Sequence, residues 1–213
     1  HSLRTPLAVV TDEAERLQQR GTGSAAADVF LSESETMQRQ IDYHLSRVRS
    51  GGSHAGMVGG VRLAAILPPL IAAMERCHPG KRFATTAAAL DTAAPSLPMD
   101  AEDLSEILSN LLDNAGKWAR SGITIDYRFD GAARRIAITD DGPGVPETER
   151  ERIFERFYRA EGTKTIPGTG LGLAIVRRVA ELHGGTPSLD AGLNGKGVCF
   201  RISFPVAGAQ EEN

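Results

Sequence analysis

The first fifty residues carry apolar positions at helical spacing. In a first segment these positions fall four and three residues apart, which is the spacing of a heptad seam. They are Leu3, Leu7, Val10, Ala14 and Leu17. A second seam of the same spacing has the members Phe30, Ser34, Met37, Ile41, His44 and Val48. Gly21 and Gly23 lie between the two seams, so we predict an antiparallel helical hairpin.

Each predicted helix of the hairpin would bury only a narrow stripe. A hairpin of about 50 residues buries too little apolar surface to be stable alone. Two copies would cover both stripes as a four-helix bundle, so we expect a homodimer. A monomeric hairpin packed on the rest of the chain is the alternative. The stretch SGGSHAGMVGG that follows is rich in glycine and indicates a flexible linker.

From residue 61 onward the pattern changes to mixed helix and strand. Helical periodicity predicts helices over 61–77, 100–119, 146–157 and 170–185. Alternating positions predict strands over 82–88, 122–129, 134–140, 186–193 and 197–205. Pro68 and Pro69 predict an early break or a late start of the first of these helices. Asp100 is expected to cap the second helix, and Asp130-Gly131 to turn between two antiparallel strands. The fold class is therefore α+β: a hairpin forming a dimeric four-helix bundle, followed by an α/β sandwich.

The bulk composition is that of a folded protein. Of 213 residues, 41% are hydrophobic and 24% are charged, which excludes a disordered chain. The net charge of -3 provides no basic field for nucleic acid. No apolar run approaches the roughly 20 residues of a membrane span, and no stretch of the given sequence has the pattern expected of a signal peptide. Cys77 and Cys199 have no paired spacing, so we expect two reduced structural cysteines.

One face of the predicted helix over 100–119 carries polar side chains suited to a metal and a phosphate. Glu106, Asn110, Asn114 and Lys117 recur at intervals of four, four and three, so they share this face. Two amide oxygens one turn apart suit Mg²⁺, which prefers oxygen ligands and retains several waters. Lys117 adds a positive charge for phosphate. Asparagine is a mediocre helix former, so helix propensity does not explain the pair.

Two glycine-containing stretches could bind a nucleotide. In TDDGPGVP, Asp140 could accept a hydrogen bond from the amine of adenine while Gly142 and Gly144 let the backbone approach the ring. Alone this is weak, since Asp-Gly-Pro-Gly is also an ordinary turn. In PGTGLGLAIV, Gly168, Gly170 and Gly172 open a helix whose N–H groups favour a polyphosphate. The spacing is neither that of a Walker A loop nor that of a dinucleotide-binding fingerprint.

His1 is either a reactive group, a helix end or a remnant of a cloning tag. If 1–20 is a helix, His1 points roughly 160° from the centre of the seam, so its imidazole faces solvent. Thr5 lies one turn later, within about 40° of His1. His44 falls within the second seam and is expected to be packed. The following LRTPL and the matched hairpin argue against a tag.

Together these stretches resemble a two-component sensor histidine kinase over essentially the whole chain. HSLRTPL resembles the H box, NLLDNAGKW the N box, DDGPGVP the G1 box, IFERFYR the F box and GTGLGL the G2 box. Five boxes in the right order make this resemblance specific. Within the family, the first segment is similar to that of sensors of the PhoQ kind. The resemblance implies a dimerisation and histidine-phosphotransfer domain over 1–50, a linker over 51–60, an ATP-binding domain of the Bergerat (GHKL) type over 61–207, and a tail over 208–213.

The resemblance also implies roles for single residues. His1 would accept the phosphoryl group of ATP and pass it to an aspartate of a response regulator receiver domain. Asn110 and Asn114 would ligate Mg²⁺, Lys117 would contact phosphate, Asp140 would read adenine, and Arg159 or Lys164 could touch phosphate. The further residues around the nucleotide would be Trp118, Gly142, Gly144, Gly168, Thr169, Gly170, Leu171 and Gly172. The stretch between Phe154 and Pro167 would form a lid over ATP, and upstream sensor and membrane segments would place this part of the chain in the cytoplasm.

Three positions qualify the expected activity. Ser2 stands where the family usually has an acid beside the histidine, and serine cannot accept a proton at neutral pH, so we expect weakened autophosphorylation. Thr5 matches the position that orients water for dephosphorylation of the regulator. Asn110 stands where hydrolytic Bergerat ATPases have a glutamate, and an amide is a poor general base. The alternatives are therefore a kinase-weak ATP-binding phosphatase or scaffold, and a non-signalling GHKL ATPase, against which Asn110 argues.

Overall fold

The structure, a computed structural model, describes residues 60–160, 170–192 and 196–206. The chain divides into two compact units, His1–Val58 and Gly59–Asn213, and all described residues belong to the second. The predicted hairpin, with His1 and Thr5, lies outside the described residues. So do Lys164, Gly168 and Thr169. No helix within the described ranges is long and apolar enough to cross a bilayer.

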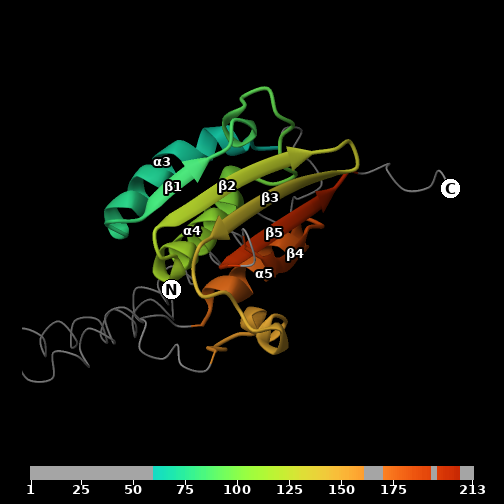
Figure 1. The fold of residues 1–213 in the computed structure, drawn as a ribbon. Helices are drawn as coiled ribbons and strands as arrows, with labels where there is room; N and C mark the ends of the chain where they lie inside the picture. The colour runs from blue at the N-terminus through green and yellow to red at the C-terminus, as the bar shows by residue number, and fades with distance from the viewer. Residues whose placement is uncertain (1–59, 161–169, 193–195, 207–213) are drawn as a thin grey trace, which may run out of the picture. The chain divides into compact units, whose positions relative to one another are not determined.

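A five-stranded sheet forms one layer of this unit (Figure 1). Its strands are β1 (Arg82–Thr85), β2 (Gly122–Phe129), β3 (Ala133–Asp140), β4 (Thr186–Ala191) and β5 (Val198–Pro205). They lie in the order β1-β2-β3-β5-β4. β1 pairs with β2 in parallel, and the other three pairings are antiparallel. The sheet is therefore mixed, in agreement with the expected combination of helices and mostly antiparallel strands.

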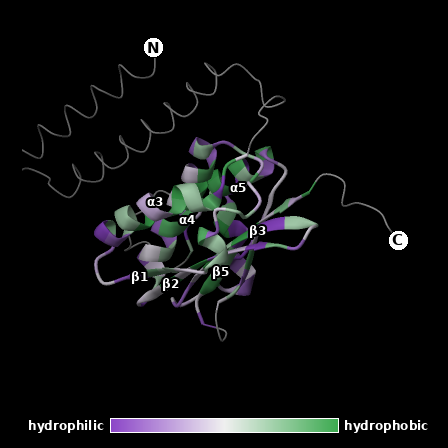
Figure 2. Ribbon diagram, turned by 90° about the horizontal axis from the view of Figure 1, so that it is seen from above, coloured by the Kyte–Doolittle hydropathy of each residue, from purple (hydrophilic) through white to green (hydrophobic). Residues whose placement is uncertain are grey.

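The helices of the second layer cover one face of the sheet. They are α3 (Leu63–Cys77), α4 (Ala101–Trp118) and α5 (Gly172–Leu182), and Figure 2 shows them on the same side. The strands alternate accordingly: Ile123, Ile125 and Tyr127 of β2 are buried, whereas the residues between them face the open side. Because alternate side chains of a strand point to opposite faces, the sheet has one apolar face under the helices and one polar face.

Helix α4 is the central element of the helical layer. Its N-cap, Asp100, accepts a hydrogen bond from the backbone N–H of Asp103 at 2.8 Å, as the sequence predicts. Its buried stripe consists of Leu104, Ile107, Leu108, Leu111, Leu112 and Ala115. The apolar spacing of three and four thus determines which side of α4 faces the sheet. The polar side chains of α4 lie on the face that points away from this apolar stripe.

Helix α3 continues through both of its prolines, so the predicted break or late start is wrong. The helix begins at Leu63 and contains Pro68 and Pro69. Each proline removes one donor from the helical ladder, which leaves a carbonyl one turn earlier without its usual partner. Both prolines are exposed, so water can reach this side of the helix. Packing of the buried Leu63 and Leu67 holds the helix together there.

The helix predicted over 146–157 is also wrong. The structure has two short 3-10 turns instead, Glu147–Glu149 and Arg152–Phe154. Phe154 is the buried residue of this stretch, and it packs edge-on against Phe200 at 6.5 Å between ring centroids. One buried side chain provides no apolar stripe, and a short helix without such a stripe is not stable.

Turn residues predicted from the sequence are where the chain reverses. Gly131, with φ of 86°, turns between β2 and β3, and the Asp130 carboxylate accepts from the backbone N–H of Ala133 at 2.9 Å. Gly184, with φ of 72°, follows the end of α5 as a helix-terminating glycine. Pro187 lies in β4, an edge strand, where a missing N–H is tolerated.

Candidate functional site

The polar face of α4 presents the amides predicted to hold a metal. Glu106, Asn110, Asn114 and Lys117 are all half-buried on this helix, with the two asparagines one turn apart. The side-chain NH₂ group of Asn110 donates to the backbone carbonyl of Glu106 at 2.8 Å. This bond uses the nitrogen of the amide and not the oxygen of Asn110, which is the atom that would bind a cation. The face therefore presents oxygen atoms suited to a hard cation.

The start of α5 lies against this face. A β-carbon on Gly172 would stand 3.0 Å from the side-chain oxygen of Asn110. Glycine at this position lets the first turn of α5 approach the amide closely. Among the described residues no side chain caps α5, whose N-cap residue is Leu171. The structure thus brings the Asn110 amide against a helix N-terminus, whose backbone N–H groups favour an anion.

Gly170 joins the start of α5 to the stretch before it. Gly170 has φ of 72°, and a β-carbon there would stand 2.8 Å from the carbonyl oxygen of Tyr158. Its carbonyl accepts a hydrogen bond from the backbone N–H of Phe157 at 3.0 Å. Phe157 itself has φ of 63° and is 72% exposed. Two residues in the left-handed region therefore fix the segment that precedes the helix.

Asp140 lies at the end of β3 and is 3% exposed. One of its side-chain oxygens, Oδ1, accepts the backbone N–H of Gly142 at 2.8 Å. The other, Oδ2, is buried without a hydrogen-bond partner among the described residues. Burial raises the pKa of this carboxyl, and the Asp141 charge raises it further, against the lowering effect of the Gly142 and Val198 N–H groups. An acceptor oxygen without a partner among the described residues has the capacity to accept one further donor.

Glycines surround Asp140 at positions where no side chain fits. A β-carbon on Gly142 would stand 2.5 Å from the carbonyl oxygen of Trp118, the last residue of α4. A β-carbon on Gly197 would stand 1.9 Å from the carbonyl oxygen of Asp140. A β-carbon on Gly144 would stand 3.1 Å from the carbonyl oxygen of Gly197. Gly142, Gly144 and Trp118 were candidates from the sequence; Gly197 was not, because its spacing to the motif is long.

Lys117 contacts a carboxylate. Its ammonium lies 2.7 Å from Oδ2 of Asp113, one turn earlier on α4. The other carboxylate oxygen of Asp113 lies 3.0 Å from Nε2 of His78. Neither Asp113 nor His78 was a sequence candidate, although the interval of four between Asp113 and Lys117 predicts an ion pair. Of the two cations proposed for the lid, Arg159 is half-buried and Lys164 lies outside the described residues.

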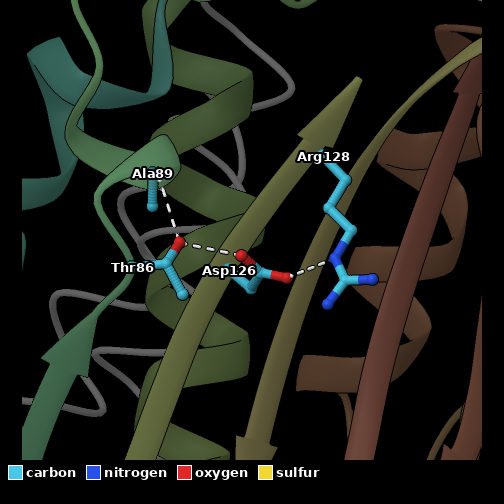
Figure 3. A network of polar contacts seen from close by, with 4 residues as sticks. All are labelled: Thr86, Ala89, Asp126 and Arg128. Atoms are coloured by element: carbon cyan, nitrogen blue, oxygen red, sulfur yellow. Dashed lines mark hydrogen bonds and ion pairs between the residues drawn. The ribbon is translucent and has the colours of Figure 1, made fainter. Parts of the chain in front are cut away.

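A shallow hollow of about 420 Å³ lies elsewhere, on the open face of the sheet. Its lining includes Thr86, Asp126, Arg128, Arg135 and Arg201, and contains none of the residues that the sequence assigned to the nucleotide, the metal or phosphoryl transfer. Asp126 accepts from the Thr86 hydroxyl and from Arg128, both at 2.8 Å (Figure 3). Arg135 and Arg201 are likewise paired, with Asp130 and Asp190. The arginines of this hollow are thus balanced by carboxylates, so within the part of the chain that the structure describes the nucleotide-type features lie at α4, α5 and Asp140.

Comparison with known families and proteins agrees with this geometry. A family model described as histidine kinase-, DNA gyrase B-, and HSP90-like ATPase matches residues 99–208. The two-component sensor PhoQ of Pseudomonas aeruginosa is 33% identical over 205 residues, which cover 96% of this chain and 44% of PhoQ. This chain therefore spans less than half the length of that relative.

Solved structures of sensor kinases are similar as well. The mycobacterial sensor histidine kinase MprB is 30% identical, with a TM-score of 0.59, over 68% of this chain and 95% of the MprB chain. Full-length ShkA, solved in complex with AMPPNP, is 26% identical, with a TM-score of 0.68, over 96% of this chain and 44% of ShkA.

Proposed function

Because this chain belongs to the histidine kinase-, DNA gyrase B- and HSP90-like ATPases, and carries an ATP-binding domain of the sensor histidine kinase type, we propose that it is a kinase core. It binds ATP through its second unit and transfers the γ-phosphoryl group to His1. The phosphoryl group then passes to an aspartate of a response regulator receiver domain. The chain spans 44% of PhoQ, so signal reception is assigned to no residue of this chain.

The observation that carries ATP binding is the Asp140 Oδ2 atom, which is buried among glycines and has no partner in the described part of the chain. The exocyclic amine of adenine is a donor that would satisfy this oxygen. Gly142, Gly144 and Gly197 let neighbouring backbone segments pack closely around Asp140, since a side chain at any of them would meet backbone. The Asp140 acceptor therefore fits the amine of a purine base, and the Trp118 carbonyl lies against Gly142 next to it.

The polar face of α4 and the start of α5 fit the phosphate part of the nucleotide. Asn110 and Asn114 offer amide oxygens for Mg²⁺, which when bound would offset negative charge on the phosphate oxygens. Gly170, Leu171 and Gly172 place backbone N–H groups at the N-terminus of α5. Gly168 and Thr169 extend this loop in the sequence, and we assign them the same role.

Transfer to His1 is favoured over hydrolysis because of Asn110. A hydrolytic relative needs a general base beside the metal to activate water, and an amide does not serve. Glu106 lies one turn earlier and contributes its carbonyl to Asn110. A neutral imidazole nitrogen of His1 would form a bond to the γ-phosphorus while the bond to the bridging oxygen breaks, and ADP leaves.

The first unit is assigned from its sequence. A hairpin over 1–50 would dimerise as a four-helix bundle and present His1, and the glycine-rich linker over 51–60 would let the ATP-binding domain, residues 61–207, reach it. A response regulator would dock on the bundle. As part of a membrane sensor, this portion of the chain would lie in the cytoplasm, with 208–213 as a tail.

A second candidate is a regulator phosphatase with weak kinase activity. It rests on Ser2, which cannot serve as the base that the family usually has there, and on Thr5, which matches the position that orients water in dephosphorylation. A Ser2→Glu variant separates the two: it raises the rate of autophosphorylation if the missing acid limits the kinase. An unchanged rate argues that another group supplies the base.

The test follows both fates of the γ-phosphate in one time course. The full chain is incubated with Mg²⁺ and γ-labelled ATP, and labelled protein and free phosphate are measured together. A kinase accumulates acid-labile phosphoprotein with little free phosphate. Release of free phosphate without any phosphoprotein would instead identify a non-signalling ATPase and overturn the proposal.

A further inference from the structure

Lys117 is held by a carboxylate that is itself held from a second element. Asp113 lies 2.7 Å from the Lys117 ammonium through Oδ2 and 3.0 Å from Nε2 of His78 through Oδ1. Both oxygens of the carboxylate are therefore engaged at once. A carboxylate fixed on one side loses little further freedom when it binds a lysine on the other.

The packing around His78 shows that this contact is built into the fold. A β-carbon on Gly116 would stand 2.5 Å from the His78 ring, so a larger residue there would displace the ring from its present place. Glycine inside a helix costs about 1 kcal/mol relative to alanine. The His78 ring also lies 6.5 Å from that of Phe83, and its side chain is only 13% exposed.

The segment that carries His78 contacts the C-terminal half of α4 and the two residues that follow the helix. His78 caps the end of α3 through its backbone N–H, which donates to the Met74 carbonyl at 2.8 Å. Three residues later the Lys81 ammonium donates to the carbonyls of Ala119 and Arg120, at 2.5 and 3.1 Å. His78 and Lys81 both precede residue 99, where the match to the family model begins.

Lys117 lies between two different neighbours around the helix. At about 100° per residue it is about 40° from Asp113 on one side and about 60° from Asn114 on the other. His78 contacts the Asp113 side, and Gly172 at the start of α5 contacts the side of Asn110. The flexible Lys117 side chain can therefore reach either the Asp113 carboxylate or a phosphate placed between the amides and α5. Its single ammonium cannot make both close contacts at once.

We propose that Asp113, fixed by His78, is a positioning residue that competes with the nucleotide's phosphates for Lys117. Binding of ATP then requires the lysine to exchange its carboxylate for phosphate oxygens. The competition lowers the affinity of a ligand only where that ligand contacts Lys117 through phosphate. It therefore lowers the affinity for ATP and leaves the affinity for adenosine, which has no phosphate, unchanged. This inference rests on the proposed binding of ATP and adds a determinant of its affinity.

The experiment measures the dissociation constants of Mg²⁺-ATP and of adenosine by calorimetry on the full chain. Asp113→Asn is expected to tighten ATP about two- to fivefold, the range of a partly exposed ion pair. It leaves adenosine affinity unchanged. In a Lys117→Met background the same substitution is expected to lose most of this gain. His78→Phe, which keeps a ring on Gly116 but no hydrogen bond, shifts ATP affinity in the same direction by a smaller factor.

Asp126→Asn is the matched control, because Asp126 is also paired with a cation but lies on the open face of the sheet. It is expected to leave both affinities unchanged. Weaker or unchanged ATP binding in folded Asp113→Asn, or a gain that persists in full without Lys117, overturns the competition. Failure of the parent chain to bind either ligand would instead overturn the proposed ATP site, so the two failures are distinct.

Discussion

The backbone of Gly197 runs directly against Asp140: a β-carbon on the glycine would stand 1.9 Å from the carbonyl oxygen of the aspartate. The same β-carbon would lie 3.0 Å from Oδ1 of the Asp140 side chain. Gly197 also has φ of 72°, a region that side chains disfavour. The start of β5 thus fixes the position of the residue that we assign to adenine.

This contact predicts the effect of Gly197→Ala. The added carbon clashes with backbone that cannot move without displacing β3, so the variant loses stability and binds ATP more weakly. Gly131→Ala is the control, since Gly131 has φ of 86° but no atom of the described residues lies within 4 Å of its would-be β-carbon. We expect about 1–2 kcal/mol from the backbone conformation alone at Gly131, and clearly more at Gly197. Equal losses in chemical denaturation would contradict the close approach.

Asp140→Asn is predicted to change stability and binding in opposite directions. The substitution removes a buried charge whose Oδ2 has no partner among the described residues, so the free protein becomes more stable at neutral pH. It also removes a charged acceptor for the base, so ATP affinity falls about tenfold or more. Thermal denaturation and calorimetry measure the two effects, and a less stable variant with unchanged affinity would be inconsistent with the assigned role.

The stability gain of Asp140→Asn depends on pH in a defined direction. Burial raises the pKa of Asp140 above its ordinary value of 3.8, so the folded state binds the proton more tightly than the unfolded state. The charged form is penalised in full above the raised pKa. As the pH falls through that value towards 3.8, the penalty disappears. The difference in unfolding free energy between variant and parent should therefore shrink on acidification, and growth of the difference would contradict the burial argument.

Asn110→Ala is predicted to remove the magnesium dependence of ATP binding. The parent chain should bind ATP more tightly with Mg²⁺ than with a chelator present, because the Asn110 and Asn114 amides supply metal ligands. The variant should bind similarly under both conditions. Adenosine binding, which needs no metal, serves as the control for an intact base site. A magnesium effect that survives in the double variant Asn110→Ala and Asn114→Ala would exclude these amides as ligands.

Asp103→Ala is predicted to loosen α4 from α5. The Asp103 carboxylate lies 2.5 Å from Nε2 of His183, and both side chains are less than a tenth exposed. Breaking a buried polar pair of this kind costs about 3 kcal/mol or more. Asp190→Ala breaks a pair with Arg201 that is more than two-fifths exposed and should cost less than about 1 kcal/mol. If denaturant titrations gave the same loss of unfolding free energy for Asp103→Ala and Asp190→Ala, the Asp103–His183 pair would contribute no more than an exposed ion pair, which contradicts the prediction.

Much of the second unit follows from local sequence pattern. The Asp100 cap and the apolar spacing of α4 predict its start and its buried face, and both are observed. Gly131 and Gly184 predict a hairpin and a helix end because glycine is suited to positive φ. These features depend on a few neighbouring residues, which is why the sequence alone suffices for them.

Features that depend on contacts distant in the sequence were missed. Tertiary packing carries α3 through Pro68 and Pro69, against their local preference. β1 pairs with β2 in parallel across α4, which no local pattern specifies. His78 meets Asp113 across 35 residues, so the sequence favoured phosphate as the partner of Lys117 while the structure pairs it with a carboxylate.

Locating the label after incubation with Mg²⁺ and γ-labelled ATP tests the central claim most directly. The full chain is digested under alkaline conditions, which preserve phosphohistidine, and its peptides are sequenced by mass spectrometry. The account predicts phosphate on His1 in the parent chain, and none on His1→Gln although that variant still binds ATP. ATP bound by the parent chain with phosphate on another residue, or on none after prolonged incubation, would contradict it.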